Sequence, residues 1–249
     1  MAAVTPASAL RASFTVDLEP DCPPYLWTFR GVEQGMPALL DLLAAAGVHA
    51  TFFTTGDVAT RYPRMVERLV AEGHELGCHG MSHTAFTELG PEAARDEIVQ
   101  SSEILRQFGP VTSFRAPYLK FPEAYVEFLK EAGFALDSSH AIYKAAYWRT
   151  RATGRPDGIA RIPASVTSSV LRLARPVRTA YLRALATPVV LFVHPWEFVD
   201  LTRERLRLDC RFKTGETALR CVADVLAWYG RRGAQFMTMR ELAAAGFGS

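Results

Sequence analysis

The stretch Glu75-Leu-Gly-Cys-His-Gly-Met-Ser-His83 places two histidines four residues apart, directly after a short apolar run. On a helix or a helical turn, side chains at this spacing project from one face. Two neutral imidazoles on one face can bind the same metal ion, as they do in zinc enzymes. Two unrelated surface or capping histidines would give the same spacing. His79 and His83 therefore indicate a metal site only together with other residues of the chain.

Outward from this stretch, runs typical of strands alternate with helical patterns along the chain. We expect strands at 13–16, 50–54, 75–77, 111–114, 134–136, 189–193 and 235–236, and helices at 31–46, 63–71, 91–108, 122–132, 168–186, 214–229 and 238–245. The helix at 168–186 is expected to be broken near Pro176. The segment 140–165 is expected to be irregular. This alternation predicts an α/β fold with a parallel sheet or a (β/α) barrel. With no internal repeat and no linker, residues 1–249 are expected to form a single domain, with 1–11 flexible.

Polar residues that could carry chemistry recur where these apolar strands end. They are Asp17 and Glu19, His79 and His83, Arg115, Asp137, and His194. In a parallel barrel the carboxyl ends of all strands meet at one face, where such folds keep their active sites. The pattern therefore predicts that these side chains converge on one site.

Composition excludes several functional classes. A net charge of +2 gives no reason to expect nucleic-acid binding. The four cysteines (Cys22, Cys78, Cys210, Cys221) lack C-x-x-C spacing, so we expect free thiols in a reducing compartment. The first twelve residues carry no continuous apolar core of a signal peptide, and no apolar run is long enough for a membrane span. We therefore expect a soluble cytoplasmic protein.

Five motifs, in order, resemble those of the polysaccharide deacetylase family (NodB homology, carbohydrate esterase 4). They are Phe14-Thr-Val-Asp-Leu-Glu19, His79-Gly-Met-Ser-His83, Phe114-Arg-Ala-Pro-Tyr118, Phe134-Ala-Leu-Asp-Ser-Ser139 and Leu191-Phe-Val-His-Pro195. The resemblance runs from about Ser13 to Leu242. It implies a distorted, NodB-like (β/α) barrel with mostly parallel strands.

The first motif departs from the family pattern. Where the family has a second Asp as metal ligand, this chain has Leu18, which cannot bind a cation. By resemblance to members with a D-x-E pattern, Glu19 is expected to be the metal carboxylate and Asp17 the base. Alternation along a strand agrees, because it places Asp17 and Glu19 on one face and Leu18 on the other. If Glu19 does not contact the metal, Asp17 or Asp21 would have to replace it.

The resemblance implies one divalent metal ion held by Glu19, His79 and His83. Zinc is the default for this ligand set, and cobalt, nickel or manganese would suit the same ligands. Asp17 is then expected to take the proton of the water that the metal activates. A structural alternative is that Asp17 only caps a loop.

The remaining motif residues receive roles from the same resemblance. Arg115 is expected to pair with Asp17 through a bidentate contact, unless it forms a plain surface salt bridge. The backbone N–H of Tyr118 would hold the oxyanion. His194 would protonate the leaving amine, with Asp137 raising its pKa. Alternatively, His194 is a core histidine and Asp137 caps a strand end.

Substrate contacts are expected from loop aromatics and from one basic segment. Tyr118, Trp27 and Trp196 are candidates for a sugar-binding rim, although loop aromatics more often pack in cores or lids. The segment Arg161 to Arg183 contains five arginines and no acidic residue. It is either a solvated basic helix or an electropositive lip that contacts an anionic substrate or lipid.

Together these patterns predict a metal-dependent hydrolase that removes the N-acetyl group from an N-acetylated amino sugar, with that sugar as its partner. A second hypothesis keeps the site but changes the substrate to a lipid-linked amino sugar that is deformylated, or to another small amide or imide. A third hypothesis is a non-catalytic carbohydrate-binding module. The presence of base, acid and metal ligands together favours an enzyme.

Overall fold

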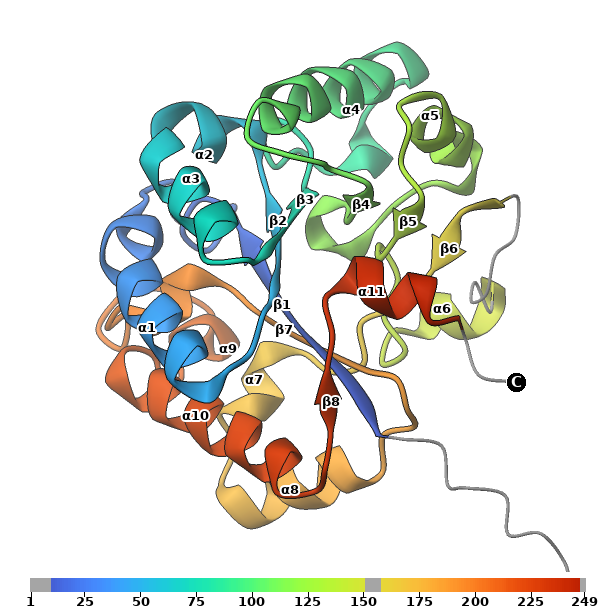
Figure 1. Cartoon of the computed structure of the whole chain (residues 1–249). Helices are drawn as coiled ribbons and strands as arrows, with labels where there is room; N and C mark the ends of the chain where they lie inside the picture. Colours follow the sequence, from blue (N-terminus) through green and yellow to red (C-terminus); the bar gives the residue numbers. More distant parts are fainter. Residues whose placement is uncertain (1–9, 151–157, 247–249) are drawn as a thin grey trace, which may run out of the picture.

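The computed structural model describes residues 10–150 and 158–246. Its centre is a parallel eight-stranded sheet with the order β6-β5-β4-β3-β2-β1-β7, in which β8 also pairs with β1. The strands are β1 (Arg11–Leu18), β2 (Thr51–Thr54), β3 (Glu75–Cys78), β4 (Ser113–Phe114), β5 (Leu136–Asp137), β6 (Ala160–Arg161), β7 (Val189–Val193) and β8 (Gln235–Phe236). The sheet curls into a distorted, incomplete barrel, as predicted (Figure 1).

Helices surround the curled sheet, and the last of them lies across one end of it (Figure 1). They are α1 (Met36–Ala46), α2 (Gly56–Arg61), α3 (Pro63–Ala71), α4 (Pro91–Arg106), α5 (Val126–Glu131), α6 (Ala145–Thr150), α7 (Ser168–Leu171), α8 (Arg175–Arg183), α9 (Leu208–Arg211), α10 (Glu216–Gly230) and α11 (Met239–Ala244). Single turns occur at Gly31–Gly35, Phe86–Glu88, Pro117–Leu119, Glu123–Tyr125 and Pro195–Phe198. Two of these turns directly follow strands and carry predicted site residues: Pro117–Leu119 comes after β4, and Pro195–Phe198 comes after β7.

Alternation along β1 decides what faces the helices and what faces the interior. Phe14, Val16 and Leu18 belong to the core cluster that β1 shares with α1 and α10, and each is fully buried. The intervening Thr15 and Asp17 contact a side chain inside the barrel, as described below. The prediction that Leu18 points into apolar packing is therefore confirmed. Because a strand alternates its faces, the same register directs Asp17 inward.

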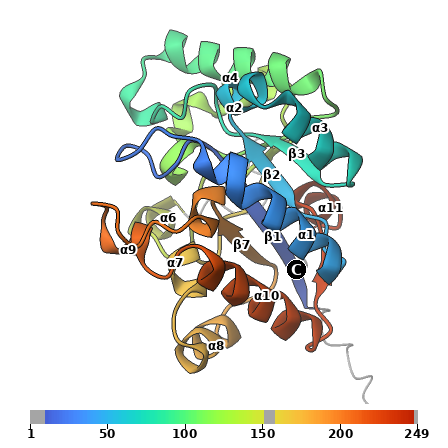
Figure 2. The same ribbon diagram turned by 90° about the vertical axis from the view of Figure 1, so that its left-hand side faces the viewer.

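The two ends of the barrel interior differ. Helix α11 closes the amino ends of the strands, with Met239, Leu242 and Ala243 in one apolar cluster with Phe53 and Leu136. In Figure 2 this helix lies on the right, whereas the loop after β1, α6 and α9 lie at the opposite end on the left. That left-hand end carries the carboxyl ends of the strands, where the sequence predicts the site.

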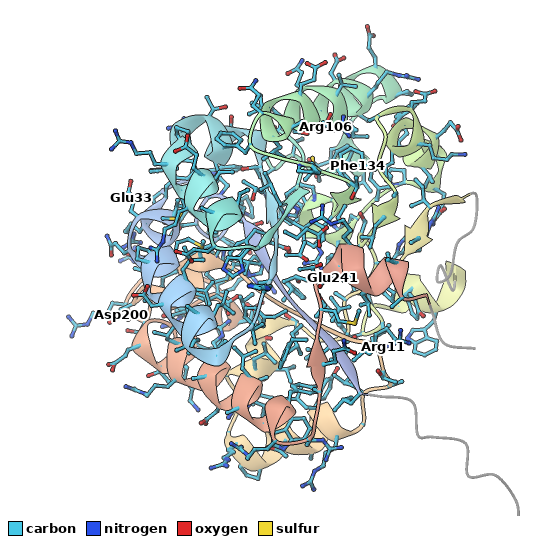
Figure 3. All side chains as sticks on the ribbon, viewed as in Figure 1. Arg11, Glu33, Arg106, Phe134, Asp200 and Glu241 are labelled. Atoms are coloured by element: carbon cyan, nitrogen blue, oxygen red, sulfur yellow. The ribbon has the colours of Figure 1, made fainter. Side chains whose placement is uncertain are left out.

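A second apolar cluster joins β3 and β4 to α4 and α5. Phe114, Phe121 and Phe134 pack edge to face or tilted within it, with centroids 5.3 to 5.5 Å apart. Arg106 of α4 covers the edge of this cluster, with its guanidinium 5.4 Å from the Phe134 ring centroid (Figure 3). The stacking of an arginine on an aromatic face shields the ring from water while the charge stays solvated.

Several predicted boundaries were wrong. Residues 140–165 contain α6 and β6 instead of being irregular. The break expected near Pro176 in the helix at 168–186 is confirmed, because α7 ends at Leu171 and α8 begins at Arg175. Helix α2 was not predicted at all. β1 already begins at Arg11, inside the range 1–11 that was expected to be flexible. Residues 1–9 of that range and residues 151–157 lie outside the described residues. In the part of the chain that the structure describes, no helix combines the length and apolarity needed to cross a bilayer.

Candidate active site

The two histidines of the metal motif lie on a loop after β3, not on a helix. The expectation of a helical face was therefore wrong. Gly80 (φ 75°) and His83 (φ 60°) adopt the left-handed conformation, which turns the loop back on itself. Glu97 of α4 holds the turn, because its carboxylate accepts hydrogen bonds from the amides of Met81 (2.7 Å) and Ser82 (3.2 Å). This loop, rather than helical spacing, brings both imidazoles to one side.

Glu19 meets both imidazoles at the carboxyl end of β1. Its Oε2 lies 2.6 Å from Nε2 of His83 and 3.2 Å from Nε2 of His79. One ligand atom from each of the three residues lies within 4.8 Å of the others, and all three side chains are buried. Burial raises the pKa of Glu19, but the surrounding His83, His194 and His79 lower that pKa well below its ordinary value. The carboxylate is therefore ionised and able to bind a cation.

The tautomer of His79 also suits a metal ligand. Its Nδ1 lies 2.7 Å from the backbone carbonyl oxygen of Arg115. A carbonyl oxygen only accepts hydrogen bonds, so Nδ1 carries a proton and Nε2 is the nitrogen that faces Glu19. The site offers one carboxylate oxygen and two imidazole nitrogens, which are buried and close together. This set of ligand atoms fits a divalent cation such as zinc. Glu19, His79 and His83 are thus brought together as predicted.

Asp17 and Arg115 form an ion pair inside the barrel. Nη1 of Arg115 donates to Oδ1 of Asp17 at 2.6 Å and to Oγ1 of Thr15 at 2.8 Å, and Nη2 donates to Ser138. The contact is therefore single and not bidentate as predicted. Arg115 is fully buried, which also excludes the surface salt bridge. Its guanidinium lies 4.2 Å from the ring centroid of Phe53, so the aromatic face helps to fix its plane.

His194 follows β7 and contacts a carboxylate that was not predicted. Its Nδ1 lies 2.8 Å from Oε1 of Glu197, and its Nε2 lies 3.8 Å from Oε1 of Glu19. The ring of Trp196 stacks on the imidazole at 4.8 Å. Burial lowers the pKa of His194, but Glu19, Glu197 and Asp17 raise it more strongly, to about 9. His194 is therefore protonated at neutral pH.

Asp137 does not contact His194, so the role predicted for it was wrong. Its Oδ1 accepts the backbone N–H of Ser139 at 2.9 Å, and its other oxygen lies 3.9 Å from Nδ1 of His140. Oγ of Ser139 in turn accepts the backbone N–H of Ala116 at 2.8 Å. Asp137 thus caps a strand end, the structural alternative, and supports the turn that carries Tyr118.

Tyr118 lies in a turn with an unusual backbone. Tyr118 (φ 59°) and Leu119 (φ 52°) are both left-handed, a conformation that costs a non-glycine residue about 1–2 kcal/mol. Lys144 donates to the carbonyl oxygen of Tyr118 at 2.6 Å and holds the turn. The amides of Leu119 and Lys120 close the turn, and the amide of Tyr118 takes no part in it. The oxyanion role of that amide stays a prediction.

One cavity of about 280 Å³ opens onto these groups. It is lined by Asp17, Glu19, His83, Tyr118, His194 and Trp196, among others. Trp196 is 6% exposed and donates from Nε1 to Oε1 of Glu19 at 3.3 Å, so it is a wall of the site and not an exposed rim. Trp27 is 55% exposed and lines a neighbouring hollow that shares His83 and Tyr118 with the cavity.

The basic segment is not a solvated helix. Arg161 pairs with Glu123, Arg172 with Glu197, and Arg178 with Asp224. These three arginines are buried. A lip for anionic substrates would therefore depend on the remaining arginines of the segment, Arg175 and Arg183.

Comparison with known proteins shows the family to which the chain belongs. The sequence profile of the family described as "Polysaccharide deacetylase" matches residues 12–136, about half of the chain. The chain belongs to the polysaccharide deacetylase family.

A chitooligosaccharide deacetylase from Bradyrhizobium sp. (strain ANU 289) is 32% identical over 139 residues, 54% of this chain and 59% of the relative. A peptidoglycan-N-acetylglucosamine deacetylase from Bacillus cereus is 33% identical over 102 residues, 40% of this chain and 37% of the relative. The matched part of this chain therefore corresponds to about 40–60% of the length of these relatives.

Solved structures share the fold over nearly the whole chain. The peptidoglycan deacetylase PdaC from Bacillus subtilis covers 95% of this chain and 91% of its own at 16% identity, with a TM-score of 0.62. A family 4 pseudoenzyme from Bacillus anthracis covers 96% of this chain and 69% of its own at 14% identity, with a TM-score of 0.63. The NodB-like fold of this member of the family is thus confirmed. The existence of a pseudoenzyme with this fold means that activity must be argued from the site residues.

Proposed function

We propose that this protein is a metal-dependent carbohydrate N-deacetylase. The observation that carries the proposal is the convergence of Glu19, His79 and His83 on one point beside Asp17 and His194. A binding module would need neither a further buried carboxylate beside the metal ligands, Asp17, nor a histidine such as His194 on the same cavity. Both are present, which favours catalysis over a decayed site.

Glu19, His79 and His83 would hold a divalent cation, with zinc the first choice for this ligand set. Such an ion, when bound, polarises a carbonyl oxygen and lowers the pKa of a water molecule to about 7. Asp17 lines the same cavity and takes the proton of the attacking water. Arg115 fixes the rotamer of Asp17, because its Nη1 donates to Oδ1 of Asp17 at 2.6 Å.

His194 and Tyr118 would act on the leaving group and on the oxyanion, respectively. Nε2 of His194 faces the cavity and carries a proton at neutral pH, so it can protonate the departing amine nitrogen. The amide of Tyr118, held in its left-handed turn, is available to donate to the carbonyl oxygen as negative charge develops there. Both roles come from the family resemblance and from this placement.

An acetamido group suits the size and polarity of the cavity. The space of about 280 Å³ is small for a whole oligosaccharide, and the hollow beside Trp27 would take the rest of the sugar. Relatives are named for deacetylation of chitooligosaccharides and peptidoglycan, which supports an N-acetylated amino sugar. Deformylation of a lipid-linked amino sugar, or hydrolysis of a small amide or imide, would use the same groups and is the second candidate.

Metal analysis combined with product release tests the proposal. The purified protein should contain about one equivalent of divalent metal and release acetate from at least one N-acetyl sugar, sugar nucleotide or chitooligosaccharide. Exhaustive chelation should abolish release, and added zinc or cobalt should restore it. Formate or another acid released in place of acetate would favour the second candidate. Turnover that survives chelation would contradict the proposal.

A further inference from the structure

We propose that Glu197, held by the buried guanidinium of Arg172, is the carboxylate that positions His194, in place of Asp137. This proposal rests on the function proposed above, because His194 is the proton donor there. Glu197 and Arg172 are positioning residues in it, since neither lies against the reacting atoms. The five motifs assign a role to neither residue.

Glu197 contacts His194 at two points. It lies in the single turn Pro195–Phe198 that follows β7, and its Oε1 accepts the backbone N–H of His194 at 2.9 Å. The same oxygen lies 2.8 Å from Nδ1 of the imidazole. Because a carboxylate accepts, Nδ1 carries a proton, and Nε2 is turned toward Glu19 and the cavity. Trp196 stacks on the ring with an interplanar angle of 18°, which opposes rotation of the imidazole.

Arg172 anchors this carboxylate from behind. The residue is 1% exposed, and its Nε lies 3.2 Å from Oε2 of Glu197. Its Nη1 donates to the carbonyl oxygen of Phe212 at 2.6 Å, and its Nη2 donates to that of Asp209 at 2.7 Å. One guanidinium therefore ties the end of α7 and the α9 region to the turn that carries Glu197. Burial raises the pKa of Glu197, but Arg172 and His194 lower it below its ordinary value, in line with a charged carboxylate.

A purely structural role would not require this arrangement. A helix cap needs an acceptor only for the backbone N–H of His194. The contact with the imidazole and the buried arginine behind it are additional, and burying an ion pair is costly unless each charge is satisfied. Asp137, the competing carboxylate, accepts the backbone N–H of Ser139 through Oδ1, and it makes no ion pair or hydrogen bond with His194 among the described residues. The contacts thus favour Glu197 as the partner of His194.

Glu197→Gln separates the two roles, because glutamine keeps an acceptor for the backbone N–H and removes the charge. We expect kcat for acetate release to fall about 100-fold, the usual scale for a misplaced acid or base, with KM changed less than about threefold. Metal content should stay at the wild-type level. Asp137→Asn should cost less activity than Glu197→Gln. Asp224→Asn, which breaks the Arg178–Asp224 pair of α8 and α10, should match the wild type in both readouts.

Nuclear magnetic resonance of the histidine ring supplies a readout that does not depend on turnover. In the wild type the Nδ1-bound proton of His194 should give a slowly exchanging, downfield signal, and Glu197→Gln should remove or shift it. Unchanged kcat with an unchanged signal in Glu197→Gln would overturn the proposal, as would an equal or larger loss in Asp137→Asn. If the wild type hydrolyses no substrate, the proposed function fails, and the signal alone then decides the positioning role.

Arg172→Lys keeps the protein testable if Glu197→Gln does not fold. Lysine retains a positive charge but cannot reach Glu197 and two carbonyl oxygens at once. We expect kcat to fall about tenfold and the Nδ1 proton of His194 to exchange faster. Wild-type values for both quantities in this variant would contradict the anchoring role of Arg172.

Discussion

Two buried glutamates at opposite ends of the barrel interior show what separates a structural carboxylate from a candidate metal ligand. Glu75, at the closed end, accepts hydrogen bonds from the hydroxyls of Thr51 and Ser113 and from the backbone N–H of Arg240. Glu19, at the open end, is surrounded by imidazoles and by a single indole N–H. The surroundings of Glu75 are fixed neutral donors. Those of Glu19 are nitrogens that bind either a proton or a metal ion.

The comparison shows that burial alone does not indicate function. Both carboxylates are almost inaccessible, at 2% for Glu75 and 4% for Glu19. The two glutamates differ in their hydrogen-bond partners. Hydroxyls and a backbone N–H always donate to Glu75, whereas an imidazole donates to Glu19 only through a nitrogen that carries a proton. The Nδ1 of His79 is engaged by the carbonyl oxygen of Arg115, so Nε2 is the nitrogen that meets Glu19, and it can hold either a proton or a cation there.

The largest effect is expected from Glu19→Gln. Loss of the anionic ligand should reduce bound metal to a trace and lower kcat/KM at least about 1,000-fold, since the metal contributes several kcal/mol. Metal content by mass spectrometry and acetate release check this expectation. Metal content equal to the wild type would show that Asp17 or Asp21 is the true ligand.

Asp17→Asn should separate metal binding from proton transfer. The variant should retain about one equivalent of metal, while kcat should fall by about 100- to 10,000-fold, because asparagine cannot accept the water proton. The same metal and acetate measurements serve here. Deacetylation at the wild-type rate would remove Asp17 from the mechanism.

Glu75→Ala should affect stability instead of chemistry. Three donors at the closed end would lose their acceptor, which should lower the free energy of unfolding by about 2–4 kcal/mol. The kcat of the folded fraction should stay within about twofold of the wild type. Chemical denaturation measures the first quantity, and Glu67→Ala on the exposed face of α3 is the control, with a change below about 0.5 kcal/mol. A large loss of kcat at full stability would contradict the structural role of Glu75.

The smallest effect concerns pH and His74, which lies one residue before Glu75. Burial lowers the pKa of His74 to about 4, and its Nδ1 accepts the backbone N–H of Ala50. The unfolded chain therefore binds this proton near pH 6.5, so stability should be full above that pH and decline as pH falls toward 4. The melting temperature should fall by a few degrees over this window, and less so in His74→Asn. An identical decline in both proteins would exclude His74 as the cause.

Much of the fold and of the metal cluster could be predicted from local pattern. Strand alternation placed Asp17 and Glu19 on the face opposite Leu18, and Leu18 is fully buried in the core cluster of β1. The pairing of His79 and His83 was predicted correctly, but the two residues were expected on a helix or helical turn and lie on a loop. The loop conformation depends on Glu97, which lies on another element, so spacing alone could not reveal it.

The partner of His194 could have been found from the sequence. Proline directly after His194, with glutamate three residues after the histidine, is a pattern typical of a capped turn, and Glu197 makes that contact. The fourth motif drew attention to Asp137 instead. The role of Arg172 could not be predicted from a local pattern. Its partners lie 25 to 40 residues away in the sequence, and only tertiary packing brings them to it.

The closure of the barrel by α11 has a consequence for biosynthesis. Strand β8 pairs with β1, and the amides at the start of α11 donate to Thr51 and Glu75. During synthesis β1 therefore remains without part of its pairing, and the barrel floor remains open, until residues 235–244 are translated more than two hundred codons after β1. Such long-range pairing slows folding and leaves apolar surface open in the meantime, so the nascent chain should depend on chaperones until these residues emerge.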